Sequence, residues 1–174
     1  STFQSQVDSA IQNLDTVSVN INYSNMSKSV LDQKFDLNIS DEMLSAMSDL
    51  FISLSGTELK ADQVNLYDFS GYVLQAGLST MVKKSDDSHN EWIQKAREAN
   101  GKKVLTAPYS TYVYSKSARY PQWFISLYRS FTNQYGRGVG VIETAKQCKS
   151  IFKSIISYEK KNHGNAASVY VFNE

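Results

Sequence analysis

The segment FISLYRSFTNQYGRGVGVIETAKQCKSIF, residues 124–152, decides the fold because it joins a β-hairpin to a helix. Apolar side chains alternate over 123–131, as is typical of a strand. GRG at 136–138 predicts the turn, and VGVIE at 139–143 predicts the returning strand. From Ala145 onward, apolar residues at helical spacing predict an amphipathic helix. We expect this helix to leave the edge of the sheet, in a position to carry a signal away.

A single apolar stripe predicts a long N-terminal helix over residues 1–24. Its members are separated alternately by four and three residues: Phe3, Val7, Ala10, Leu14, Val17 and Ile21. Residues 17–23 also alternate as a strand would, but the six-position stripe is longer, so we predict a helix. The stripe is of heptad type, and two packing partners stay open: the domain's own sheet, or a second copy of the chain in a homodimer.

Short helices and strands are predicted between these two ends. They are a helix that ends before Gly56, a hairpin over 64–77, a short helix over 89–101 closed by Gly101, and an extended segment over 106–115. The charge cluster at 83–87 is interpreted as solvated surface.

This order of elements predicts an α+β fold of the PAS-like kind for residues 25–161. Its antiparallel sheet carries the long N-terminal helix and further flanking helices. Residues 162–168 are predicted to be a linker and 169–172 a strand. The segment 162–174 is therefore expected to begin a second module.

Composition argues against several classes of function. With 18 Lys and Arg against 17 Asp and Glu, the net charge is +1, so we expect no nucleic-acid partner. One cysteine and two histidines exclude an internal disulfide and leave little for a metal site, so no metal or other cofactor is expected. No nucleophile and base stand in a recognisable arrangement, so we predict that the domain is not an enzyme.

EWIQKAREANGKKVLTAPY at 91–109, followed by the hairpin that ends in GVGVIET at 138–144, resembles the bacterial Cache sensor domains. The matching positions are Trp92, Ala96, Gly101 and Thr106–Tyr109. The resemblance is to the membrane-distal half of double Cache domains in sensor histidine kinases. It implies an extracytoplasmic small-molecule sensor in a two-component histidine kinase, held at the membrane only by flanking spans outside this sequence.

The resemblance also bears on the class of ligand. In amino-acid-binding members, an arginine just ahead of the tryptophan binds the ligand carboxylate, whereas Ser85 and Asn90 stand at the corresponding offsets from Trp92 here. Asparagine cannot replace the guanidinium fork. We therefore expect a small-molecule ligand of unknown class, with amino acids disfavoured. An acidic residue at the end of the returning strand is retained as Glu143.

Six residues are candidate ligand contacts: Trp92, Tyr109, Tyr112, Tyr114, Arg129 and Glu143. Trp92 either lines the pocket or anchors its helix on the sheet, and the helical spacing to Ala96 favours the anchor. Arg129 lies between apolar residues of a strand, so its charge needs a partner. We expect Glu143, Asp68 or a ligand anion to supply that partner.

Other classes of function stay open beside the sensor. A PAS-like dimerisation or scaffold module would have a pocket filled by its own side chains, and a chemotaxis receptor would use the same sensor domain with another output. A cytosolic enzyme or regulator with this fold would lack flanking membrane spans.

Overall fold

An antiparallel sheet of seven strands forms the centre of the computed structural model, which describes residues 3–25, 27–28, 40–56, 59–114, 119–133 and 135–153. The strands are β1 (Gln63–Asp68), β2 (Tyr72–Gly77), β3 (Met81–Lys84), β4 (Val104–Leu105), β5 (Tyr109–Tyr114), β6 (Arg119–Thr132) and β7 (Gly138–Gln147). The helices are α1 (Phe3–Tyr23), α3 (Asp41–Ser55), the short 3-10 helix η1 (Asp87–His89), α4 (Asn90–Glu98) and α5 (Cys148–Ile151). The strand order is β3-β2-β1-β7-β6-β4, and β5 pairs with the part of β6 that β4 leaves open.

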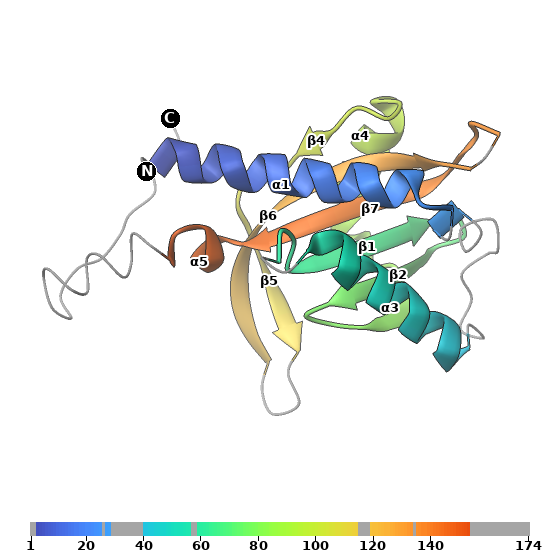
Figure 1. Ribbon diagram of the computed structural model, residues 1–174, viewed down its shortest axis with the longest axis horizontal. Helices are drawn as coiled ribbons and strands as arrows, with labels where there is room; N and C mark the ends of the chain where they lie inside the picture. The colour runs from blue at the N-terminus through green and yellow to red at the C-terminus, as the bar shows by residue number, and fades with distance from the viewer. Residues whose placement is uncertain are drawn as a thin grey trace, which may run out of the picture.

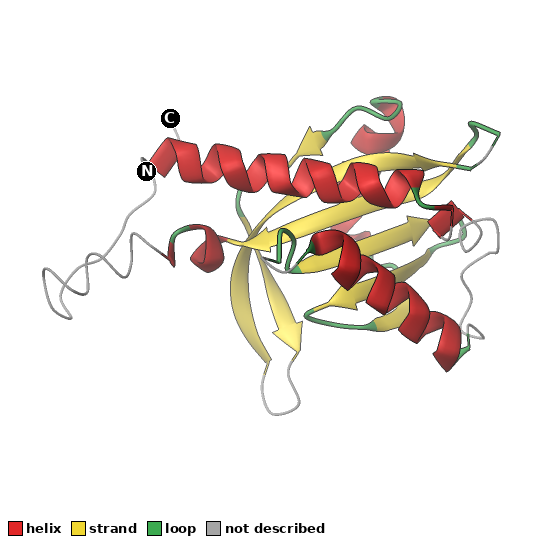
Figure 2. Cartoon of the chain, viewed as in Figure 1, coloured by secondary structure: helices red, strands yellow, loops and turns green. Residues whose placement is uncertain are grey.

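Helices cover both faces of this sheet. Figure 1 shows α1 and α3 crossing one face, with α4 behind the sheet, and Figure 2 shows the same arrangement by type of element. Apolar residues of α1 and α3 form the main core with the alternate residues of β1, β2, β6 and β7 that point toward them. The opposite face carries a smaller cluster between α4 and the sheet. This arrangement confirms the predicted α+β, PAS-like fold.

The apolar stripe of α1 packs on the domain's own sheet. Leu14, Val17 and Ile21 are completely buried in the main core, which explains why a segment rich in β-branched residues is helical despite its low propensity. At the start of α1, Phe3 stacks on Phe152. The domain's own sheet therefore covers most of the stripe, Phe3 stays 40% exposed, and a homodimer through this helix stays a prediction.

Capping residues set both ends of α3, and its end before Gly56 was expected. The Ser40 hydroxyl accepts a hydrogen bond from the Met43 amide over 3.2 Å, which satisfies one of the free N–H groups of the first turn. Asp41 and Glu42 follow, where negative charge complements the helix dipole. Gly56 ends the helix with φ of +74°, a conformation that other residues rarely adopt.

The hairpin of the opening segment is longer than predicted. β7 continues to Gln147 because Thr144 and Ala145 pair with both β1 and β6, so the prediction of a helix from Ala145 is wrong. The helix α5 begins at Cys148 and is described only to Ile151. Moreover, β7 lies in the middle of the sheet, so this helix does not leave from a sheet edge as expected.

Two further elements differ from the predictions. The strand β3 includes Lys83 and Lys84, which belong to the charge cluster predicted at 83–87. β3 is an edge strand, and such a strand tolerates lysines. The helix α4 ends at Glu98, and Gly101, with φ of +87°, lies in the turn beyond it rather than capping it. The predicted linker and strand of 162–174 lie outside the described residues. None of the helices within the described ranges has the length and hydropathy needed to cross a membrane.

Candidate functional site

A buried carboxylate, Glu143 of β7, lies at the centre of the sheet face that α4 covers. Its side chain is 1% exposed and accepts four hydrogen bonds. Oε2 accepts from Asn65 Nδ2 at 2.8 Å and from Tyr67 Oη at 2.7 Å. Oε1 accepts from Ser126 Oγ at 2.7 Å and from Tyr109 Oη at 2.9 Å. A carboxylate has about four acceptor positions, so these donors fill them.

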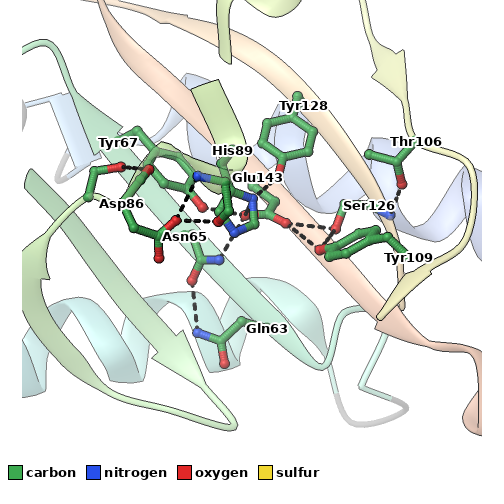
Figure 3. A network of polar contacts seen from close by, with 12 residues as sticks. Gln63, Asn65, Tyr67, Asp86, His89, Thr106, Tyr109, Ser126, Tyr128 and Glu143 are labelled. Atoms are coloured by element: carbon green, nitrogen blue, oxygen red, sulfur yellow. Dashed lines mark hydrogen bonds and ion pairs between the residues drawn. The ribbon is translucent and has the colours of Figure 1, made fainter. Parts of the chain in front are cut away.

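Strand alternation brings these donors together from three neighbouring strands. Asn65 and Tyr67 are successive residues on one face of β1, and Glu143 lies directly opposite Asn65 in the register. On the other side, Ser126 of β6 and Tyr109 of β5 complete the ring (Figure 3). The network therefore ties β1, β5 and β6 to the central strand β7.

His89 of η1 covers this network from above the sheet. Its Nδ1 shares a 2.6 Å hydrogen bond with Tyr128 Oη and lies 3.9 Å from Glu143 Oε2. Burial raises the pKa of Glu143, but the His89 ring and the hydrogen bonds from Asn65, Tyr67 and Ser126 lower that pKa below its usual range. Glu143 is accordingly ionised at neutral pH.

The surrounding tyrosines remain protonated. Burial, together with the negative charge of Glu143, raises the pKa of Tyr67, Tyr109 and Tyr128 above the ordinary value for tyrosine. Tyr67 and Tyr109 donate their single hydroxyl hydrogens to Glu143, so toward a ligand their oxygens act as acceptors. Hydroxyl oxygens that are fixed around one carboxylate can orient a polar ligand.

A cavity of about 220 Å³ lies beside Glu143 on this face. Its walls come from β1, β2, β3, η1, β5, β6 and β7: Gln63, Asn65, Gln75, Leu78, Ser79, Lys83, Asp86, His89, Tyr109, Thr111, Tyr112, Phe124, Glu143 and Ala145. This volume exceeds the roughly 150 Å³ of an engineered cavity that holds benzene and is smaller than the roughly 300–1,000 Å³ of drug-binding pockets. A molecule of a few heavy atoms fits it.

Polar groups on the cavity wall are fixed by short hydrogen bonds. Gln63 Nε2 donates to Asn65 Oδ1 at 3.0 Å, and the backbone amide of Ser79 donates to Gln63 Oε1 at 3.0 Å. Asp86 accepts from the backbone amide and the hydroxyl of Ser88 through the same oxygen, Oδ1. The wall is thus ordered before any ligand enters.

The structure brings three of the six predicted contact residues to one cavity. Tyr109 and Glu143 are joined by a hydrogen bond, and both line the cavity with Tyr112, which is 52% exposed. Trp92 packs on Tyr128 in the cluster under α4, which agrees with its role as a helix anchor. Tyr114 belongs to β5, and its side chain lies outside what the structure describes. A direct ligand contact of each residue stays a prediction.

Arg129 lies on the other face of the sheet. Its guanidinium pairs with Asp15 of α1, donates to the carbonyl of Gly101, and donates to Ser18 Oγ at 3.1 Å. The expectation that Glu143 or Asp68 is its partner is wrong, because alternate residues of β6 point to opposite faces, and Arg129 follows Tyr128. The interpretation as a structural ion pair fits this position, and a ligand in the cavity cannot reach Arg129.

Sequence reasoning missed Asn65, Tyr67, Ser126, Tyr128 and His89 as members of the network. A signal was present in β1, where Gln63, Asn65 and Tyr67 alternate with Val64 and Leu66. Polar residues on one face of a buried strand need partners, and that need points to a polar network.

The comparisons with known proteins concern structure alone. No model of a known protein family matches the chain, and no curated protein sequence is significantly similar to it. Among solved structures, the extracellular domain of vpHK1S-Z8, named as a histidine kinase, has a TM-score of 0.62 and 12% identity, covering 87% of this chain and 55% of that one.

Two chemoreceptor domains are also similar. The ligand-binding domain of Pseudomonas aeruginosa PctC, solved with GABA, has a TM-score of 0.54 and 12% identity over 86% of this chain and 59% of that one. That of Campylobacter jejuni Tlp3, solved with L-norvaline, has a TM-score of 0.50 and 18% identity over 87% of this chain and 60% of that one. The chain shares its fold with these three domains. It spans 55% to 60% of the length of these three structures.

These comparisons overturn one prediction about the class of ligand. We expected amino acids to be disfavoured ligands, but solved domains of this fold hold L-norvaline and GABA. The expectation relied on the missing arginine near Trp92 and assumed that a carboxylate must bind there. In the structure, another cation, Lys83 of β3, lines the cavity. No group of His, Cys, Asp or Glu side chains in the described ranges is arranged to hold a metal ion.

Proposed function

We propose that this domain is the extracytoplasmic, ligand-sensing part of a transmembrane receptor, either a histidine kinase or a chemoreceptor. The ligand is a small polar molecule that binds in the cavity beside Glu143, and amino acids are among the candidates. The domain acts by binding, without catalysis of its own, and any output lies in other parts of the receptor.

The open cavity is the observation that carries this proposal. A scaffold module would have its pocket filled by its own side chains, whereas the space beside Glu143 amounts to about 220 Å³. The cavity is lined by aromatic hydroxyls and amides that are already held in place, which is the usual composition of a specific small-molecule site. The fold is shared with domains named as sensory and ligand-binding, which supports the same assignment.

The network around Glu143 also supports a sensing role through its connections. The network reaches β1, β5, β6 and η1, so a ligand that contacts it touches most of the elements on this face. A ligand can shift a conformational equilibrium only by its differential affinity for the two states. A ligand that contacts several elements at once can bind one arrangement of these elements more tightly than another, which gives the required difference in affinity.

A thermal-shift screen of the purified domain tests the proposal. The panel comprises amino acids, amines, organic acids, sugars and nucleobases. A ligand at about 100 times its Kd adds about 2.7 kcal/mol of stability, which raises Tm by roughly 5–10 °C for a chain of this size.

A matched pair of variants assigns a response to the cavity. Thr111 lines the cavity, so Thr111→Tyr adds a ring to its wall and is expected to abolish the shift. Ser110→Tyr adds the same ring at an exposed neighbouring position of β5 and is expected to preserve the shift. A flat response of the wild-type domain across the panel would contradict the sensor proposal and favour the scaffold.

A further inference from the structure

Lys83 is a cation at the cavity wall that the Glu143 network does not include. It lies on β3 directly opposite Val73, a residue of the cluster under α4, so it belongs to the same sheet face as Glu143 and His89. Its side chain is half-buried. The next residue, Lys84, lies opposite Tyr72, points to the other face and is exposed.

No hydrogen bond or ion pair joins Lys83 to another of the described residues. Lys95, Lys103 and Lys146 pair with Glu91, Asp15 and Asp62, respectively, at 2.5–3.1 Å. The charge of Lys83 is felt by the neighbouring residue Asp86, since the pKa of Asp86 is held low mainly by the Ser88 hydroxyl and in smaller part by His89 and Lys83. Lys83 and Asp86 nevertheless do not form an ion pair with each other.

The two acids of the cavity differ in what they can still accept. Glu143 already accepts four hydrogen bonds and has no acceptor position left. Asp86 uses Oδ1 for Ser88 and leaves Oδ2 toward other partners. The cavity thus presents a separated cation and anion on one wall, with a second, saturated anion at its floor.

We propose that the ligand is a small zwitterion whose carboxylate pairs with Lys83 and whose cationic group faces Asp86. This inference rests on the proposed function and names the ligand class and the residue that selects it. An ammonium–carboxylate pair in a half-buried site is a strong, charge-assisted contact. A simple anion would neutralise Lys83 but would also meet Asp86 and Glu143, and the cationic group of a zwitterion removes that repulsion.

The same argument assigns Glu143 a positioning role. Because its acceptor positions are filled, Glu143 holds Tyr109, Ser126, Asn65 and Tyr67 in place and need not contact the ligand directly. Carboxylate recognition thereby comes from the edge strand β3. Asn90 stands at the offset from Trp92 at which an arginine was expected for amino-acid recognition. Its side-chain amide donates a hydrogen bond to Asp87 at 2.7 Å.

Isothermal titration calorimetry with matched ligands tests this inference. The zwitterions are the standard amino acids, L-norvaline and GABA. Each binder is compared with its analogue that lacks the amine and its analogue that lacks the carboxylate: for L-norvaline these are pentanoate and n-butylamine, and for GABA butyrate and n-propylamine. At least one zwitterion is expected to bind, and each of its analogues to bind about tenfold more weakly or worse.

Variants of the two adjacent lysines complete the test. Lys83→Gln weakens the zwitterion about tenfold or more, Lys83→Arg restores most of the affinity, and Lys84→Gln binds as the wild type does. Equal affinity in Lys83→Gln, or a tightest ligand without a carboxylate, would overturn the inference and leave the sensor proposal standing. Failure of the wild type to bind any compound of the broader thermal-shift panel would overturn the sensor proposal itself, and the inference with it.

Discussion

Replacement of Glu143 by glutamine removes one negative charge at nearly constant shape and tests whether the network stabilises the fold. An amide nitrogen replaces one carboxylate oxygen, and each of those oxygens accepts two hydrogen bonds. Two charge-assisted bonds are therefore lost, at roughly 1.5–3 kcal/mol each. Removal of a buried charge offsets part of this loss. We expect Glu143→Gln to lower the free energy of unfolding by about 2–4 kcal/mol.

Urea denaturation followed by circular dichroism measures this change, and a thermal melt gives a second value. A loss of that size lowers Tm by roughly 5–15 °C for a chain of this length. The matched control is Glu91→Gln, the same chemical change at a side chain that is 70% exposed and paired with Lys95. The control is expected to cost at most about 0.5 kcal/mol. If Glu143→Gln were no more destabilising than Glu91→Gln, the assignment of Glu143 as the centre of the network would be refuted.

Three further predictions follow from the same contacts. Asp15→Asn removes the charge that pairs with Arg129, a side chain that is 12% exposed. This change is expected to lower the free energy of unfolding by about 1–3 kcal/mol in urea denaturation. The control Asp8→Asn, at an exposed site of the same helix, is expected to lower it little. Gly140→Ala places a Cβ 2.4 Å from the backbone oxygen of Tyr67, so it is expected to destabilise the fold by about 1–3 kcal/mol, and unchanged stability would argue against the β1–β7 pairing. The folded-state pKa of Glu143 is below the unfolded value of about 4.3, so its stabilising contribution is complete above about pH 5 and is lost as pH falls through the folded pKa. Stability measured from about pH 5 to pH 3 should therefore fall less steeply in Glu143→Gln than in the wild type, and identical slopes would contradict this origin.

Periodicity predicted the larger elements because each is governed by local sequence. The α1 stripe, the end of α3 before Gly56 and the β6–β7 hairpin all follow from spacings of a few positions along the chain. The end of β7 could not be predicted in this way. Ala145 and Cys148 fit a helical face, but the pairing of Ala145 with β1 and β6 decides the conformation.

The candidate site could be predicted only in part for a related reason. Glu143 and Tyr109 were found through a resemblance to sensor domains, and they are bonded in the structure. The partner of Arg129 is Asp15, 114 residues away, and Asn65 is 78 residues from Glu143. Contacts across such distances depend on the strand order and register, which no local pattern contains.

A crystal structure of the domain with a ligand found in the thermal-shift panel tests the central claim most directly. Electron density for the ligand is expected in the cavity between Lys83, Asp86 and Tyr109, with the four hydrogen bonds of Glu143 retained. Density for the ligand at another place on the molecule, with this cavity empty, would contradict it.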